Sequence, residues 1–184
     1  MRVIAGTARR CALTKPKGQA IRPTTDMVKE ALFSIIQFDI AGRRVLDLFA
    51  GTGQLGIETL SRGAASCDFV DESRTAVELV QTNLARVKLE GGHVHRSRAE
   101  VFLRAGLRYD LIFLDPPYGY PKLDEIINKI AEFDILSKNG ILVCETDVDQ
   151  VLPPVQQPYA QGRNYRYGKV KVTLYTRDER GSRL

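Results

Sequence analysis

A glycine-rich segment, DLFAGTGQLG at residues 47–56, is the first candidate for chemistry in this chain. It follows an apolar run and precedes a helical one, and its spacing matches the Gly-x-Gly-x-x-Gly loop in which bare backbone approaches a nucleotide. Asp71 stands twenty residues after Gly51, at the end of the next apolar run, where an acid accepts hydrogen bonds from ribose hydroxyls. We interpret the pattern as a nucleotide-binding loop. The alternative is a tight strand-to-helix turn without a ligand.

Charge indicates which nucleotide derivative fits this loop. Asp47 opens the glycine segment, and Asp115 ends another apolar run that we expect beside it. Two carboxylates repel the pyrophosphate of a dinucleotide and attract a ligand that carries an amino group and a sulfonium. The pair therefore predicts S-adenosylmethionine, with the NAD of an oxidoreductase as the weaker alternative.

The segment Asp115-Pro116-Pro117-Tyr118 directly follows the apolar run 111–114. Two prolines cannot continue a central strand, so the chain must leave the sheet at its carboxyl edge. Pro117 restricts Pro116 to extended geometry, so that the Pro116 carbonyl and the Asp115 carboxylate can accept the two hydrogens of one exocyclic amine. Tyr118 offers a ring on which a base can stack, worth about 1–3 kcal/mol. The alternative is a rigid turn with a packed tyrosine.

Alternating strand and helix patterns must position these two segments. Short β-rich apolar runs are separated by stretches of helical periodicity, which predicts a parallel sheet with helices on both faces and ligands at the carboxyl ends of its strands. The expected strands are 45–49, 67–71, 93–96, 111–114, 141–145 and 170–175, and the expected helices are 54–62, 75–87 and 122–133.

The segments before and after this block differ from it. Residues 1–22 predict a basic β-hairpin or arm that turns at 15–18, and a helix begins near Asp26, whose carboxylate suits a first turn. A proline-rich loop and a final antiparallel hairpin, turning near Gly168, close the chain. We divide the chain into an arm, 1–22, and a main domain, 23–184. Because the arm holds few large apolar residues, we expect the core to form without it.

Asp-Pro-Pro-Tyr at 115–118 resembles the signature of amino-group methyltransferases that use S-adenosylmethionine. The segments 22–33 (RPTTDMVKEALF) and 47–58, with the Tyr167-Gly168 turn, are similar to the bacterial 16S rRNA guanine-N2 methyltransferase family. The resemblance covers residues 3–177. It implies an α/β fold, the Rossmann-like class I methyltransferase, with a seven-stranded mostly parallel sheet, an antiparallel last strand and a small N-terminal hairpin. Residues 23–184 are then the methyltransferase domain.

The resemblance further implies methyl transfer from S-adenosylmethionine to the exocyclic N2 of a guanine in 16S rRNA. This chain departs from the family at Arg98, where an acidic residue usually faces the adenine. The expected catalytic residues are Asp115, Pro116 and Tyr118; the expected cofactor-binding residues are Asp47, Phe49, Ala50, Gly51, Gly53, Asp71, Glu72, Arg98, Ala99 and Asp115; and the expected substrate-binding residues are Pro117, Tyr118, Arg9, Arg10, Arg22 and Thr24.

Two other functions remain open at the level of sequence. Adenine-N6 methylation of DNA or RNA is one, because the same motif serves any exocyclic amine. A non-catalytic RNA-binding assembly factor on the same scaffold is the other, although the intact motif at 115–118 argues against it.

Composition indicates the partner and the compartment. The chain of 184 residues is 43% hydrophobic and 27% charged, the balance of a globular domain. Its net charge of +5 gathers in residues 1–25 and after 159, which predicts a polyanionic partner, 16S rRNA or a small-subunit assembly intermediate. A solvated basic surface is the alternative. The apolar runs are too short to span a membrane, a secretory signal is missing, and three dispersed cysteines predict neither zinc nor disulfides. We expect a cytoplasmic monomer.

Three lesser candidates complete the set. His93 and His95 share a strand face, but a third ligand is not apparent, so we expect no metal site. Glu58, in the first helix after the glycine loop, favours a structural role over a ligand contact. Glu145 ends the fifth expected strand beside Asp115, and its role stays open.

Overall fold

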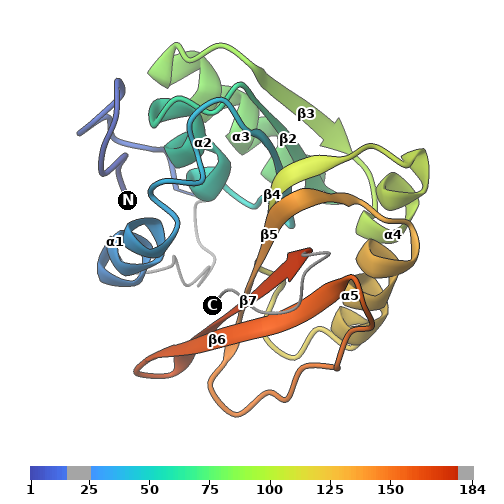
Figure 1. The fold of residues 1–184 in the computed structure, drawn as a ribbon. Helices are drawn as coiled ribbons and strands as arrows, with labels where there is room; N and C mark the ends of the chain where they lie inside the picture. The colour runs from blue at the N-terminus through green and yellow to red at the C-terminus, as the bar shows by residue number, and fades with distance from the viewer. Residues whose placement is uncertain (16–25, 178–184) are drawn as a thin grey trace.

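The computed structural model describes residues 1–15 and 26–177. One seven-stranded sheet runs through the molecule in the order β3-β2-β1-β4-β5-β7-β6 (Figure 1). The predicted sheet is confirmed, together with each of the expected strands, and β6 is the first strand of the expected final hairpin. The strands are β1 (Arg44–Leu48), β2 (Ser66–Asp71), β3 (Gly92–Arg96), β4 (Tyr109–Leu114), β5 (Leu136–Asp147), β6 (Tyr159–Tyr167) and β7 (Val170–Arg177).

The five strands β3, β2, β1, β4 and β5 are parallel to one another, whereas β7 is antiparallel to both β5 and β6. β5 is longer than the expected strand because it begins at Leu136, which also pairs with β4, and ends at Asp147. Tyr109 pairs with Leu136, and the register then shifts before Leu111 pairs with Ile141. Asn139, with a left-handed φ of 58°, lies within this irregular stretch. Its turn-forming residues hid the pairing from the sequence pattern.

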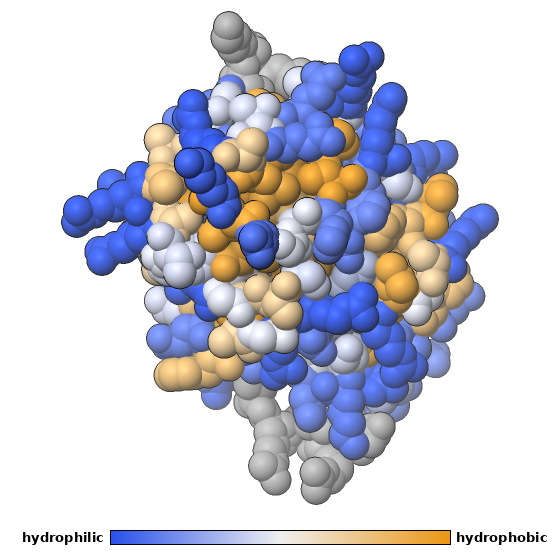
Figure 2. All heavy atoms as spheres, turned by 90° about the horizontal axis from the view of Figure 1, so that it is seen from above, coloured by the Kyte–Doolittle hydropathy of each residue, from blue (hydrophilic) through white to orange (hydrophobic). Residues whose placement is uncertain are grey.

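Helices cover both faces of the sheet, as predicted. α1 (Asp26–Ile35), α2 (Gln54–Ser61) and α3 (Arg74–Val87) pack on one face; α4 (Ala99–Phe102), the 3-10 turn η1 (Leu103–Ala105) and α5 (Leu123–Glu132) pack on the other (Figure 1). Because both faces are covered, β1 and β4 are buried along nearly their whole length. Seen from above, the surface is mainly hydrophilic around an apolar area (Figure 2). Within the described residues, we find no helix with the length and apolarity that a membrane span requires.

Residues 1–15 form a hairpin that we call the arm. The Val3 amide donates to the Cys11 carbonyl at 3.0 Å, and the Leu13 amide donates to the Met1 carbonyl at 3.2 Å. The arm turns at residues 6–10, where Gly6 has a φ of +81° and lies so close to α2 that a Cβ would stand 1.8 Å from the Ser61 carbonyl oxygen. Of the expected turn at 15–18, all residues after Lys15 lie outside the described residues. The expected domain boundary after residue 22 does so as well.

The arm is packed into the core, in disagreement with the expectation that the core forms without it. Val3, Ala8 and Leu13 are buried in the same cluster as the apolar residues of α1 and α2. Glu58 of α2 is fully buried and accepts hydrogen bonds from the amides of Ile4 and Ala5, at 2.8 and 2.9 Å. The arm's apolar residues are few, as the sequence shows, but hydrogen bonds from its backbone to Glu58 also attach it to α2.

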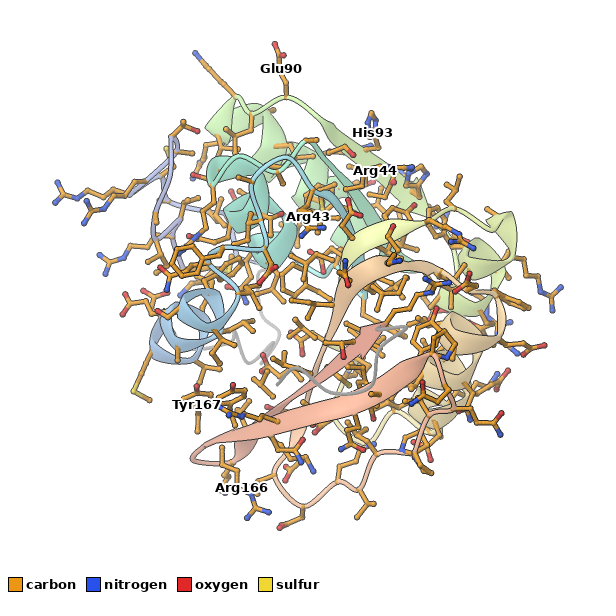
Figure 3. The ribbon with its side chains drawn as sticks, in the orientation of Figure 1. Arg43, Arg44, Glu90, His93, Arg166 and Tyr167 are labelled. Atoms are coloured by element: carbon orange, nitrogen blue, oxygen red, sulfur yellow. The ribbon has the colours of Figure 1, made fainter. Side chains whose placement is uncertain are left out.

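The final hairpin turns at Gly168, which has a left-handed φ of 61°. Asp147 pairs with Val170, so the turn lies beyond the carboxyl end of β5. Arg166 and Tyr167 stand at this end of the hairpin (Figure 3). Tyr167 packs partly against the core, whereas Arg166 is exposed.

Candidate active site

The glycine loop joins the carboxyl end of β1 to the start of α2. Phe49, Gly51 and Gly53 all have left-handed φ angles, of 63°, 56° and 76°, so the chain reverses within a few residues. At Gly53, a Cβ would meet the Val80 methyl groups at 3.2 Å. At Gly56, a Cβ would lie 2.3 Å from the Phe69 ring, so this glycine lets α2 pack tightly on the sheet. The three glycines thus have the turn and packing roles that the Gly-x-Gly-x-x-Gly pattern predicts.

Asp47 lies beneath this loop. It is almost fully buried, and its carboxylate accepts a hydrogen bond from the Gly56 amide at 3.0 Å. Burial raises the pKa of Asp47 to about 7, with the Gly56 amide opposing the shift and the negative charge of Asp71 adding to it. A carboxyl group that is only partly ionised near neutral pH is well suited to a cationic partner, because an adjacent positive charge would complete its ionisation.

Asp71 ends β2 and faces the same loop. One carboxylate oxygen accepts from the Gly51 amide at 3.0 Å, and the other accepts from the Ser73 amide at 2.9 Å. The Ser73 hydroxyl in turn caps α3 by accepting from the Ala76 amide. Asp71 therefore connects the loop after β1 to the start of α3, in addition to any contact with a ribose.

The Asp115-Pro116-Pro117-Tyr118 segment leaves the sheet directly after β4, as predicted. Leu48 pairs with Leu114, so this segment emerges beside Phe49 at the start of the glycine loop. Asp115 is half-buried and Pro116 is buried, whereas Pro117 is exposed and Tyr118 keeps 48% of its surface accessible. The two sequence motifs, far apart in the chain, thus meet at one edge of the sheet.

Tyr120 joins the two loops and was not identified from the sequence. Its amide donates to the Pro117 carbonyl at 3.0 Å, which closes a turn around Gly119. Its ring packs edge-on against Phe49, with the ring centroids 4.9 Å apart. The sequence does show a tyrosine two residues beyond the motif. Its contact with Phe49 depends on the pairing of β1 with β4, which the motif alone does not show.

An open hollow of about 340 Å³ lies at the carboxyl ends of β2 and β3, lined by Glu72, Arg96, Ser97 and Arg98. Arg98 donates to Glu100 at 2.5 Å, which draws its guanidinium toward α4. Ala99 is buried beside the hollow. The structure thus brings Glu72 and Arg98, two expected cofactor residues, to one surface next to Asp71.

The remaining candidates lie away from this edge or outside the described residues. Arg9 and Arg10 are exposed at the turn of the arm, near Ser61 at the far end of α2. The eight residues of α2 separate the two arginines from the glycine loop by about 12 Å along the helix axis. Arg22 and Thr24 lie outside the described residues.

Two of the lesser candidates, His95 and Glu58, have structural partners. His95 lies 2.7 Å from the Asp68 carboxylate, which also accepts from the Tyr109 hydroxyl at 2.9 Å. Among the residues that the structure describes, no group of three or more potential ligands could hold a metal ion. Glu58 bonds the arm and lies 3.6 Å from Lys29, in agreement with the structural role favoured for it.

A Rossmann-like sheet with a glycine loop after β1 and Asp-Pro-Pro-Tyr after β4 defines a class I methyltransferase. Comparison with known proteins gives the family. The model of the family described as Conserved hypothetical protein 95 matches residues 1–176, and the chain belongs to this family.

Curated relatives agree with this assignment. YlbH of Bacillus subtilis, provisionally named an rRNA methyltransferase, is 40% identical over 180 residues, covering 95% of this chain and 98% of the relative. Ribosomal RNA small subunit methyltransferase D of Escherichia coli is 34% identical over 182 residues, covering 98% of this chain and 92% of the relative. The solved structure of YhhF from Escherichia coli, provisionally named a methyltransferase, has a TM-score of 0.88 at 34% identity and covers 98% of this chain and 99% of that chain. The resemblance to bacterial small-subunit rRNA methyltransferases is confirmed.

Proposed function

We propose that this chain transfers a methyl group from S-adenosylmethionine to the exocyclic N2 of a guanine in 16S rRNA. The observation that carries the proposal is the pairing of Leu48 with Leu114, which brings the glycine loop and the Asp115–Tyr118 segment to adjacent strand ends. One loop suits a nucleoside-containing methyl donor, and the other suits an amino group on a base.

The residues at the sheet edge fit this donor. When bound, S-adenosylmethionine supplies a methyl group on a sulfonium, which a nitrogen lone pair can accept by in-line displacement. Gly51 and Gly53, with Phe49 and Ala50, would line its methionine end, and the buried carboxyl of Asp47 would favour its amino group. Asp71 would accept from the ribose hydroxyls, and the hollow of about 340 Å³ at Glu72 and Arg98 has room for the adenine.

Asp115 and Pro116 would orient the guanine. Its N2 is a weak nucleophile because its lone pair is delocalised into the ring. The Asp115 carboxylate and the Pro116 carbonyl would each accept one N2 hydrogen, which directs the lone pair toward the methyl group. The nitrogen becomes cationic as its new bond to carbon forms and then releases a proton readily to Asp115 or solvent, so a strong base is not required.

Tyr118 would hold the base outside the RNA stack. Nearly half of its surface is exposed, directly after Pro117, so its ring is accessible to a splayed-out base. Arg9 and Arg10 are exposed on the arm and would contact phosphates, while Arg166 offers a further cation on the final hairpin. The substrate would be 16S rRNA or a small-subunit assembly intermediate, met by a monomer in the cytoplasm.

The experiment that tests this function identifies the product. The protein is incubated with S-adenosylmethionine carrying a labelled methyl group and with 16S rRNA, and the RNA is digested to nucleosides. Label in N2-methylguanosine supports the proposal. Label in N6-methyladenosine would instead support the adenine alternative, and cofactor binding without transfer would support the non-catalytic one.

A further inference from the structure

Asn83, on the buried side of α3, joins the arm to the glycine loop. Its side chain is fully buried. Its Oδ1 accepts from the Thr14 amide at 2.7 Å, and its Nδ2 donates to the Thr52 carbonyl at 2.9 Å and to the Thr14 carbonyl at 3.3 Å. The Asn83 oxygen thus faces an N–H group and its nitrogen faces two carbonyls. Only one orientation of the side-chain amide satisfies all three bonds.

The arm also contacts the glycine loop directly, at Thr52. The Thr52 hydroxyl donates to the Met1 Sδ at 3.4 Å. Met1 and Thr14 lie at the open end of the arm, where the Leu13 amide bonds the Met1 carbonyl. The open end of the arm therefore rests on the loop, while its turn rests on the far end of α2 at Ser61.

Two different elements thus fix consecutive residues of the loop. Asp71 of β2 accepts from the Gly51 amide, and Asn83 of α3 donates to the Thr52 carbonyl. The glycines on both sides of Thr52 have left-handed φ angles and lack side chains that would restrict them. The peptide group between Thr52 and Gly53 is held on both sides, because the Gly53 amide donates to the Ala50 carbonyl at 2.7 Å and Asn83 donates to the Thr52 carbonyl. Of these two contacts, the one with Asn83 comes from outside the loop.

We propose that Asn83 is a positioning residue for the methyl donor, and that it makes the geometry of the glycine loop depend on the docked arm. The inference rests on the proposed function in one respect, that the loop holds S-adenosylmethionine. In metal sites, outer contacts that orient the binding groups typically change affinity or activity by about 10- to 100-fold, and we expect an effect near the lower end of this range here.

α3 provides a matched control. Arg86, one turn after Asn83, donates from Nη1 to the Ala12 carbonyl at 3.3 Å, and so binds the arm without reaching the loop. Arg86→Ala removes one exposed contact, while the bonds of the arm to Glu58, Ser61 and Asn83 remain, so the arm should stay docked. If the donor site responded to any weakened contact of the arm and not to the bond between Asn83 and Thr52, Arg86→Ala would weaken it in the same way.

The test compares Asn83→Ala and Arg86→Ala with the parent chain. Calorimetry with S-adenosylmethionine should show a Kd at least about tenfold higher for Asn83→Ala and within about twofold for Arg86→Ala. In steady-state assays, Asn83→Ala should raise the KM for S-adenosylmethionine, while kcat at saturation and the KM for RNA stay within about threefold. An unchanged Kd in Asn83→Ala, or an equal loss in Arg86→Ala, would overturn the inference.

Asn83→Asp is the variant that tests the inference if Asn83→Ala does not fold. Its carboxylate keeps an acceptor for the Thr14 amide but has no hydrogen for the Thr52 carbonyl, whereas the protonated acid can donate again. The Kd ratio of variant to parent should therefore be large at pH 8 and fall toward one at lower pH. Asp47 also titrates in this pH range, but it is present in both proteins, so its effect on the Kd cancels in the ratio. A ratio independent of pH contradicts the inference, whereas a parent chain that does not bind S-adenosylmethionine contradicts the proposed function.

Discussion

The Asp71 carboxylate accepts a hydrogen bond from the Gly51 amide at 3.0 Å, across the boundary between the end of β2 and the loop after β1. The same carboxylate accepts from the Ser73 amide at 2.9 Å. A residue expected only to bind ribose therefore also shapes the loop that holds the rest of the ligand. Asp71 is half-buried, which leaves part of its surface available to a bound molecule.

Asp71→Ala should weaken the binding of S-adenosylmethionine by about 10- to 150-fold, because it removes a charge-assisted hydrogen bond worth about 1.5–3 kcal/mol. Calorimetry measures the change, and Glu78→Ala, which removes an exposed acid on α3, is the control. An affinity equal to that of the parent chain would show that Asp71 does not face the ligand.

Asp47→Asn should change how stability depends on pH. Burial raises the pKa of Asp47 to about 7, from an ordinary value of 3.8. Between these two values the folded protein keeps a proton that the unfolded chain has released, so this carboxyl makes the parent less stable as the pH rises. Asparagine retains an acceptor for the Gly56 amide and does not ionise.

The free energy of unfolding of Asp47→Asn, relative to that of the parent, should therefore increase by about 2–3 kcal/mol between pH 5 and pH 8, at about 1.4 kcal/mol for each pKa unit. Urea titrations of both proteins at the two pH values give this difference, and other titrating groups cancel. A difference that stays constant with pH would mean that Asp47 is ionised throughout.

Glu58→Gln should destabilise the fold through the arm. Glu58 lies 3.6 Å from Lys29, and both side chains are fully buried. Burial lowers the pKa of Lys29, and the nearby Glu58 opposes that shift. Removing the carboxylate charge leaves Lys29 without its buried partner, at a cost of about 3–5 kcal/mol.

The measurement is the free energy of unfolding by urea. Replacing both residues, Glu58→Gln with Lys29→Met, should recover part of the loss because the buried charge of Lys29 is then removed as well. The rest of the loss includes the ion pair of Glu58 with Arg62, at 2.9 Å. If Glu58→Gln is as stable as the parent, the charge of Glu58 contributes nothing to holding the arm or Lys29.

Most of the fold was predictable because it depends on local pattern. Leu111–Leu114 is a continuous apolar run and Val45–Leu48 is apolar except for Asp47, as expected for strands covered on both faces, and the breaks at Gly51 and Pro116 mark where the chain leaves the sheet. The packing of the arm was not predictable in this way. It depends on hydrogen bonds that Glu58 and Asn83 accept from backbone amides more than 50 residues away, and such bonds leave no periodic signal.

The same distinction applies to the site. Asp115 and Tyr118 carry their chemistry in a contiguous motif, so the sequence identifies them. The contact between Phe49 and Tyr120 requires β1 to lie beside β4, although six elements separate these two strands along the chain. The position of Arg9 and Arg10 near Ser61 likewise follows from where the arm turns, and the expected turn was placed elsewhere.

Tyr118 should act through its ring and not through its hydroxyl. Tyr118→Ala loses a stacking contact of about 1–3 kcal/mol, so methyl transfer at subsaturating RNA should fall by about 5- to 150-fold. Tyr118→Phe keeps the ring and should stay within about threefold of the parent. A phenylalanine variant as inactive as the alanine variant would assign the role to the hydroxyl.

The most direct test of the central claim is single-turnover methyl transfer to guanine N2 by Asp115→Asn, at saturating S-adenosylmethionine and 16S rRNA. Asparagine keeps one acceptor oxygen but removes the charge that stabilises the developing cationic nitrogen. The rate of N2-methylguanosine formation should fall by roughly 100-fold or more, about 3 kcal/mol of transition-state stabilisation, while cofactor affinity changes little. Formation of N2-methylguanosine at the parent's rate by Asp115→Asn would contradict the account.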